Sequence, residues 1–304
     1  MDRSTPALAV AGLSGALVAV QTRVNGGLAD ELGDALLAAV LSFGTGLVAV
    51  ALVVAARPAA RNALRDVRRV PWWTCLGGLG GATLVAVAAF AAPRIGVALL
   101  SIGIVAGQTT GGLLVDRAGL GPGGGHRLTL PRLVGAVLSL VAVGVSVAGR
   151  GAGDANPVLL VLAVLAGLLI SVQQALNGRV RRITGNAAVA TLVNFVVGLV
   201  ALLLAYCVVG LFRDFAVDSW PDSWWLYTGG VLGATFVAVA AVVVRTLGVL
   251  RLGLAVIAGQ LLGAVVLDVV TPAADNGVAA ATLIGVALTF IAVGITGRGV
   301  RTPA

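Results

Sequence analysis

The chain has 304 residues, of which 59% are hydrophobic and 11% are charged, and its mean hydropathy is +1.06. This composition is far more apolar than that of a soluble globular domain, so it predicts a polytopic membrane protein and leaves no room for a soluble domain. The net charge of +8 could indicate nucleic-acid binding, but every basic residue is an arginine and most arginines fall in short segments between apolar runs.

Ten apolar runs follow one another along the chain, each close to the 20 or so residues that a helix needs to cross a bilayer core. They cover residues 6–25, 35–56, 74–93, 95–115, 131–149, 156–177, 187–211, 223–244, 249–268 and 277–296. Arg3 precedes the first run, as in a signal peptide, but the same segment recurs inside the chain, where it cannot be cleaved off. The pattern therefore predicts an all-α membrane protein with ten transmembrane helices.

The arginines between the runs predict the orientation of the chain. With a cytoplasmic N-terminus, sixteen arginines fall on inner segments and four on outer ones, which satisfies the positive-inside rule. The four outer arginines are Arg23, Arg94, Arg150 and Arg213. We therefore expect a multi-pass protein of the cytoplasmic (inner) membrane with both termini in the cytoplasm, surrounded by the lipid bilayer and not binding nucleic acid.

The two halves of the sequence repeat each other. A shift of 152 residues aligns them without a gap from the first predicted helix to the fourth, and the fifth helix realigns at a shift of 150. The aligned pairs include Gln21 with Gln173, Asn25 with Asn177, Gly33 with Gly185, Phe43 with Phe195, Gly46 with Gly198, Trp72-Trp73 with Trp224-Trp225, and Gly107-Gln108 with Gly259-Gln260. Because glutamine and tryptophan are rare in this chain, chance is a poor explanation for these matches.

Each half, residues 1–150 and 151–304, holds five predicted helices, which is an odd number. The two repeats must then cross the membrane in opposite directions, as in secondary transporters that bind their solute between inverted repeats. The alternative is an old duplication that is kept only for packing. The glycines at 103, 107 and 111, echoed by small residues at 255, 259 and 263, fit that alternative, since small residues at this spacing let two helices approach closely.

Three motifs occur once in each half. They are a Gln/Asn helix ("GALVAVQTRVN" and "GLLISVQQALN"), an aromatic-glycine segment ("SFGTG" and "NFVVG") and a Gly-Gln helix that ends in aspartate ("GQTTGGLLVD" and "GQLLGAVVLD"). Together they resemble the YdcZ-like family of the drug/metabolite transporter superfamily over nearly the whole chain. The resemblance implies a fused form of a family with many five-helix members that pair, and a ten-helix basket whose fifth and tenth helices lie away from the central cavity.

Amides within the apolar runs are the candidate solute-binding groups. Gln21 and Asn25 are four residues apart and so share a helix face, and Gln173 and Asn177 keep that face in the second half. An amide offers both donors and an acceptor without a charge. The candidate residues are Gln21, Asn25, Gln108, Gln173, Asn177, Asn194 and Gln260.

These amides could instead bridge helices by hydrogen bonds, each worth roughly 0.6–2 kcal/mol. The sequence leaves both interpretations open for Asn25 and Asn177, which lie near helix ends. It favours a cavity for Gln108 and Gln260, which are central in their helices.

Other chemistries find little support in the sequence. No Asp or Glu falls in the middle of a predicted span, both cysteines lie within spans, and the one histidine, His126, lies in a glycine-rich loop. The chain has no lysine, which a phosphate-binding P-loop needs. We therefore expect no metal and no cofactor.

The leading hypothesis is a secondary transporter or facilitator for a small polar solute, neutral or zwitterionic, that works by alternating access. The alternatives are a membrane-embedded enzyme, which the scarcity of catalytic groups disfavours, and a membrane scaffold without a substrate. A homodimer is left open, as are the identity of the solute, the direction of transport and the coupling ion.

Overall fold

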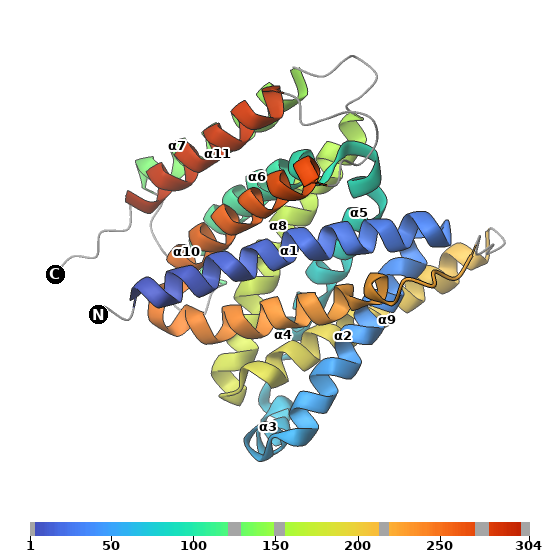
Figure 1. Ribbon diagram of the computed structural model, residues 1–304. Helices are drawn as coiled ribbons and strands as arrows, with labels where there is room; N and C mark the ends of the chain where they lie inside the picture. Colours follow the sequence, from blue (N-terminus) through green and yellow to red (C-terminus); the bar gives the residue numbers. More distant parts are fainter. Residues whose placement is uncertain (1–3, 121–128, 149–155, 213–218, 271–279, 299–304) are drawn as a thin grey trace.

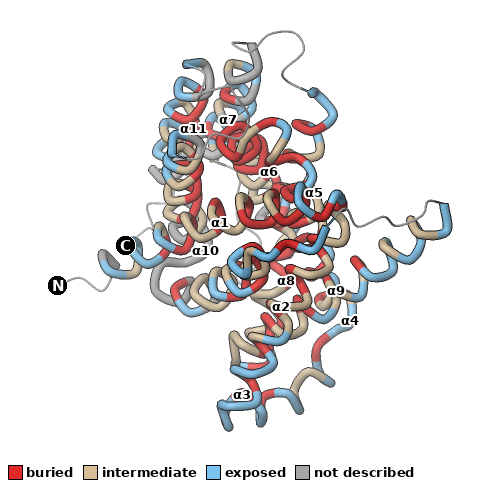
Figure 2. The backbone as a smooth tube through the Cα atoms, turned by 45° about the vertical axis from the view of Figure 1, so that its right-hand side comes forward, coloured by how far each residue is buried: buried red, intermediate tan, exposed pale blue. Residues whose placement is uncertain are grey.

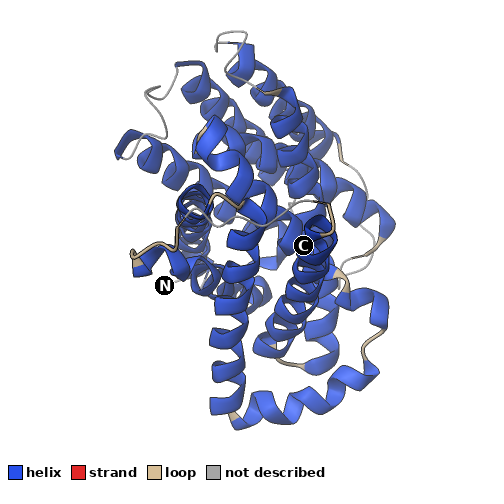
Figure 3. Cartoon of the chain, turned by 90° about the vertical axis from the view of Figure 1, so that its right-hand side faces the viewer, coloured by secondary structure: helices blue, strands red, loops and turns tan. Residues whose placement is uncertain are grey.

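The structure is a computed structural model that describes residues 4–120, 129–148, 156–212, 219–270 and 280–298. Every regular element in these ranges is helical (Figures 1 and 3). The α-helices are α1 (Ser4–Leu32), α2 (Ala35–Ala56), α3 (Pro58–Ala63), α4 (Trp72–Cys75), α5 (Gly77–Ile95), α6 (Val97–Ala118), α7 (Leu130–Ala148), α8 (Pro157–Thr184), α9 (Ala187–Gly210), α10 (Gly229–Val270) and α11 (Ala280–Arg298), with 3₁₀ turns η1 (Leu64–Arg69) and η2 (Trp224–Thr228).

Within the described ranges, 6 helices are long and apolar enough to cross a membrane, which confirms an all-helical protein of the membrane class. These spans are Pro6–Leu32, Ala35–Ala56, Trp72–Ile95, Val97–Val115, Pro157–Thr184 and Ala187–Gly210. Shorter apolar stretches at Leu133–Ala142, Trp224–Ala240, Ala255–Leu267 and Leu283–Ala292 fall within the other four predicted runs.

The first helix of each half ends in the same way. α1 continues beyond the predicted residue 25 and stops at Gly33, whose φ of 72° is a conformation that glycine adopts at little cost. Asp34 then caps α2 by accepting hydrogen bonds from two backbone amides, at 2.8 and 3.0 Å. In the second half Gly185 has a φ of 67° and Asn186 caps α9. Local chemistry thus sets the same turn at equivalent positions.

α10 doubles back along α1. Gly233, in its first arm, lies against Gln21 near the end of α1, whereas Gly259, in its second arm, lies against Gly12 near the start. Ala11 packs in one cluster with both Val243 and Val256. Since both arms follow α1, but in opposite directions, the chain must reverse between residues 243 and 256. Figure 1 shows the two arms on either side of α1.

Several helices of one half pack mainly on helices of the other half. α1 packs on α10, whereas its counterpart α8 packs on α5 and α6; α2 packs on α9, and α7 packs on α11. α2 and α9 are antiparallel, because Val209 at the end of α9 faces the start of α2 while the rings of Phe43 and Phe195 meet near the middle, 5.0 Å apart. The α2–α9 and α7–α11 contacts each join repeat counterparts, whereas the contact of α1 with α10 is equivalent to that of α8 with α5 and α6.

Burial is greatest in the middle of this arrangement. The span of α6 is 67% buried and that of α9 is 22% buried, and Figure 2 shows buried segments gathered on α5 and α6. Exposed apolar residues cover the outer sides of α2 and α9, as expected for helices that face lipid.

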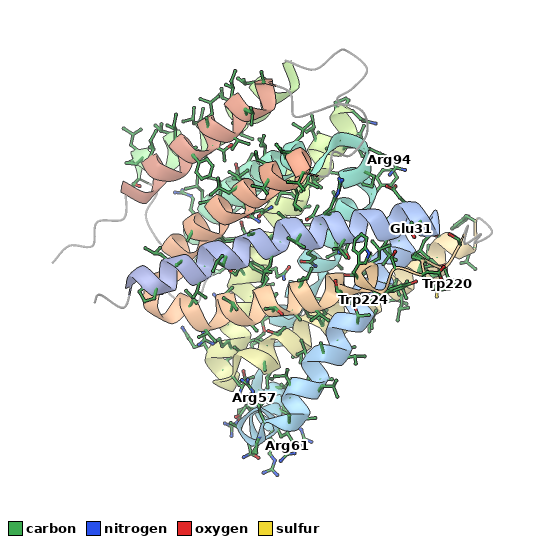
Figure 4. All side chains as sticks on the ribbon, in the orientation of Figure 1. Glu31, Arg57, Arg61, Arg94, Trp220 and Trp224 are labelled. Atoms are coloured by element: carbon green, nitrogen blue, oxygen red, sulfur yellow. The ribbon has the colours of Figure 1, made fainter. Side chains whose placement is uncertain are left out.

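Charged and aromatic residues gather at the ends of the helices. Figure 4 shows Glu31, Arg94 and Trp220 at one end of the protein and Arg57 and Arg61 at another. We call these the Glu31 end and the Arg57 end. Segments that the arginine pattern assigns to one side of the membrane therefore come together in space.

Candidate solute site

The Asn177 cluster lies where α8 meets α5 and α9. Asn177 Nδ2 donates a hydrogen bond to Asn194 Oδ1 at 3.0 Å. A Cβ on Gly77 would lie 2.8 Å from Asn177 Oδ1, and one on Gly81 would lie 3.1 Å from Gln173 Oε1. Glycines on α5 thus leave room for both amides of α8, so three of the predicted residues come together here.

The Asn25 cluster is its counterpart, where α1 meets α2 and the first arm of α10. Gly229 lies against Asn25, and Gly233 lies against Gln21. Asn25 and Ser42 are each 1% exposed, but neither the Asn25 amide nor the Ser42 hydroxyl has a hydrogen-bond partner. Ser42 is the counterpart of Asn194. Its shorter side chain leaves the amide of Asn25 unpaired.

Phe43 and Phe195 stand between the two clusters. Their rings are tilted by 36° to each other, and the side chains are 3% and 4% exposed. Phe43 contacts the position of Gly81, and Phe195 contacts Gly46, which in turn lies against Gly230. Because the two phenylalanines are repeat counterparts in mutual contact, the relation between the halves is centred on this pair. The sequence signals the pair only through its recurrence.

Gln108 and Gln260 lie apart from these clusters, at the closest helix crossings. The backbone of Gln108 accepts a hydrogen bond from Ser171 Oγ at 2.8 Å, so α6 touches α8 there, and the Gln108 side chain is half-buried. Gln260 lies where α10 crosses α1 at Gly15. Its side chain is 1% exposed and neither of its amide atoms has a partner.

The glycine seams predicted for close helix contact are confirmed. A Cβ on Gly107 would overlap the carbonyl oxygen of Val164, and one on Gly259 would overlap that of Gly12. These are equivalent crossings, α6 on α8 and α10 on α1. The seams therefore bring two helices of opposite halves into backbone contact at each crossing.

A cavity of about 610 Å³ opens at the Glu31 end, and we call it the Asp30 pocket. Its charged and aromatic lining consists of Asp30, Asp34, Phe90 and Arg94. The predicted amides are not among the residues that line it. Comparison of the two repeats could not find this pocket, because the residues aligned with Asp30 and Arg94 are of other types.

Tryptophans flank the helices as predicted for interfacial anchors, with one exception. Trp72 and Trp224 are 76% and 77% exposed. Trp73 instead lies under the guanidinium of Arg179, which is 5.0 Å from its ring centroid. Arg179 also donates a hydrogen bond to the carbonyl oxygen of Gly119 at 2.7 Å, so it ties α8 to the end of α6.

Metal-ligating groups do not gather in the described part of the chain, where no three His, Cys, Asp or Glu residues come together. Cys75 and Cys207 are free thiols. His126 and the side chains of Asp116 and Asp268 lie outside what the structure describes.

The geometry defines a helical membrane protein whose two halves are packed through equivalent seams. A family model described as "Putative inner membrane exporter, YdcZ" matches residues 6–145 and again residues 158–295. The chain therefore belongs to the YdcZ family.

One solved structure, titled "Crystal structure of protein", is similar over 100% of both chains, with a TM-score of 0.63 and 21% sequence identity. At this identity the likeness extends to the fold alone. No curated protein matches the sequence.

Proposed function

We propose that the protein is a secondary transporter that moves a small neutral or zwitterionic solute across the inner membrane by alternating access. Membership in a family of described membrane exporters supports the transporter class. We also propose that the chain crosses the membrane ten times, as two inverted five-helix repeats, with both termini in the cytoplasm. In this orientation the Arg57 end is cytoplasmic by the positive-inside rule, and the Glu31 end is external.

The observation that carries the proposal is that the two equivalent amide clusters differ in state. At the Asn177 cluster Asn177 and Asn194 are joined by a 3.0 Å hydrogen bond, although Gln173 Oε1 has no partner, whereas at the Asn25 cluster both amide atoms of Asn25 and the hydroxyl of Ser42 are unpaired. Unpaired buried polar groups cost about 1–3 kcal/mol each. A second conformation could give the Asn25 cluster hydrogen-bond partners while the Asn177 cluster loses its hydrogen bond. The free energy gained at the first cluster would then offset the loss at the second.

The seams supply a route for such a change. Backbones in contact through Gly107 and Gly259 carry no side chains that interlock, so the crossing helices can slide or pivot past each other. In our proposal the Asn25 cluster lies on the outer approach, the Asn177 cluster on the inner approach, and the Phe43–Phe195 pair closes the path between them.

Gln108 and Gln260 are assigned to the solute. Gln260 presents two buried amide atoms without partners, which a polar solute or water entering between α1 and α10 would satisfy. A purely structural amide would have a partner across the seam. The unpaired state of Gln260 thus favours a transport role over helix bridging.

The test is a Gln260→Leu variant in proteoliposomes loaded with a mixture of polar metabolites, with efflux followed by mass spectrometry. Transport should fall at least tenfold, while stability in detergent is unchanged or higher, because the substitution removes two unsatisfied groups. The control is Gln174→Leu, which changes an exposed amide outside the clusters. If loaded liposomes with wild-type protein release the metabolites no faster than loaded liposomes without protein, the proposal of a transporter is refuted and a scaffold is favoured.

A further inference from the structure

The Asp30 pocket holds two opposite charges, a carboxylate and a guanidinium. Asp30 and Arg94 line the same cavity, on α1 and α5 respectively, and lie within electrostatic range of each other. The described contacts include no ion pair between them. A carboxylate and a guanidinium that face one cavity without pairing can each bind a group of the opposite charge.

The guanidinium is held in place. Arg94 stacks on the ring of Phe90, with its central carbon 4.0 Å from the ring centroid, and donates one hydrogen bond to the backbone carbonyl of the same residue. It lies in the last turn of α5, where the helix dipole favours a cation. Because a guanidinium has five N–H donors, others are left for a carboxylate ligand.

The carboxylate occupies an unfavourable place. Asp30 lies in the last turn of α1, where the helix dipole disfavours an anion, and Asp34 nearby adds a second negative charge that is engaged in capping α2. The second repeat has Arg182 at the position equivalent to Asp30, as the dipole prefers, and Thr246 at that of Arg94. The first repeat thus departs from the favourable pattern, and a bound cationic group would add to the electrostatic stabilisation that Arg94 and Arg23 already give this carboxylate.

The remaining lining residues are apolar, and they are Ala29, Gly33, Ala35, Leu36, Ala86 and Val209. The cavity volume of about 610 Å³ is in the range of small-molecule sites. A ligand with adjacent positive and negative groups and a short aliphatic or aromatic body matches this lining.

We propose that the Asp30 pocket binds a small zwitterion, with its ammonium group on Asp30 and its carboxylate on Arg94. The proposal deepens the proposed function, on which it rests for taking the pocket as the external approach of the solute path, and it names amino-acid-like zwitterions as the substrate class.

The test measures binding of alanine, leucine and phenylalanine to purified protein by calorimetry. Each is compared with its amide, which lacks the anionic group, and with its N-acetyl derivative, which lacks the cationic group. At least one amino acid should bind ten times more tightly than both of its derivatives. Absence of binding by all three, or equal binding of the derivatives, would overturn the proposal.

Variants assign the two contacts. Asp30→Asn and Arg94→Gln should each weaken binding of the amino acid by about tenfold to a hundredfold, since each removes a charge-assisted contact. Glu31→Gln, an exposed neighbour that does not line the pocket, should bind as the wild type does. Arg94→Lys is a second variant at this position, in case Arg94→Gln does not fold. Because lysine keeps the positive charge, Arg94→Lys should bind the amino acid more tightly than Arg94→Gln does. Unchanged affinity in both Asp30→Asn and Arg94→Gln would overturn the proposal.

A phospholipid headgroup is also zwitterionic when it carries ethanolamine. Binding of the amino acid is therefore repeated in nanodiscs of phosphatidylglycerol with and without phosphatidylethanolamine, and equal affinity in both supports a free solute. A marked loss with phosphatidylethanolamine would assign the pocket to lipid and overturn the proposal. Transport that depends on Gln260 but not on Asp30 would refute this inference alone, whereas binding at the pocket without any transport would refute the proposed function.

Discussion

Replacing Gly107 by alanine should destabilise the protein, because the added Cβ would overlap the carbonyl oxygen of Val164 and come within 2.9 Å of the Leu168 amide nitrogen. Both are backbone atoms, which cannot rotate away as a side chain can, so α6 and α8 must move apart. Overpacking of this kind costs about 1–3 kcal/mol. Gly259→Ala, at the equivalent crossing of α10 on α1, should cost a similar amount.

Gly112→Ala is the matched control. It lies on the same helix, but a Cβ there would meet nothing within 4 Å. Alanine is the better helix former by about 1 kcal/mol, so this variant should be as stable as the wild type or more stable. The expected gap between the Gly112 and Gly107 variants is therefore roughly 2–4 kcal/mol.

The assay is equilibrium unfolding in mixed micelles, titrated with a denaturing detergent and followed by tryptophan fluorescence. Gly107→Ala and Gly259→Ala should unfold at lower denaturant than the wild type, and Gly112→Ala should not. If Gly107→Ala matches Gly112→Ala, the backbones are not in contact and the reasoning about the seams fails.

Further substitutions at Ser42, Phe43 and Asp34 test the Asn25 cluster, the phenylalanine pair and the α2 cap, with stability measured by the same titration. Ser42→Asn should stabilise the protein by about 1 kcal/mol, since it gives Asn25 the partner that its counterpart already has; a loss of stability would show that the space is too small. Phe43→Ala should cost about 3–5 kcal/mol, because it removes a buried ring stacked on Phe195, and a cost under 1 kcal/mol would contradict the packing. Asp34→Ala should cost roughly 0.5–2 kcal/mol through loss of the α2 cap, whereas Asp34→Asn should retain most of the stability.

Much of the fold can be predicted from the sequence, because the signals are local. The predicted run 35–56 coincides with α2, since an aspartate cap and uninterrupted apolar residues define it. Gly33 and Gly185 recur because each ends a helix in a left-handed conformation. Hydrophobic length alone placed the end of the first run at residue 25, whereas α1 continues to Leu32, because polar residues near a helix end are no barrier to helix formation.

Pairing between helices could not be predicted in the same way. The repeat shows that α1 and α8 are equivalent, but periodicity does not say that each packs on helices of the other half. Asn25, Gln173 and Gln260 are buried, but which of the amides find partners depends on the neighbouring helix, which periodicity does not identify. The Asp30 pocket depends on residues that occur in one repeat only, so aligning the two halves gives no signal for it.

Crosslinking across the Asn177 cluster tests the alternating-access mechanism most directly. Gly77 and Asn177 are replaced by cysteines in a background without Cys75 and Cys207, since the Gly77 Cβ position lies 2.8 Å from the Asn177 side chain. Efflux from proteoliposomes is then measured before oxidation, after oxidation and after reduction, with each single-cysteine variant as a control. The account predicts that oxidation of the double variant alone stops transport and that reduction restores it. Unchanged transport by fully crosslinked protein would contradict the account, since this crossing would then not need to open.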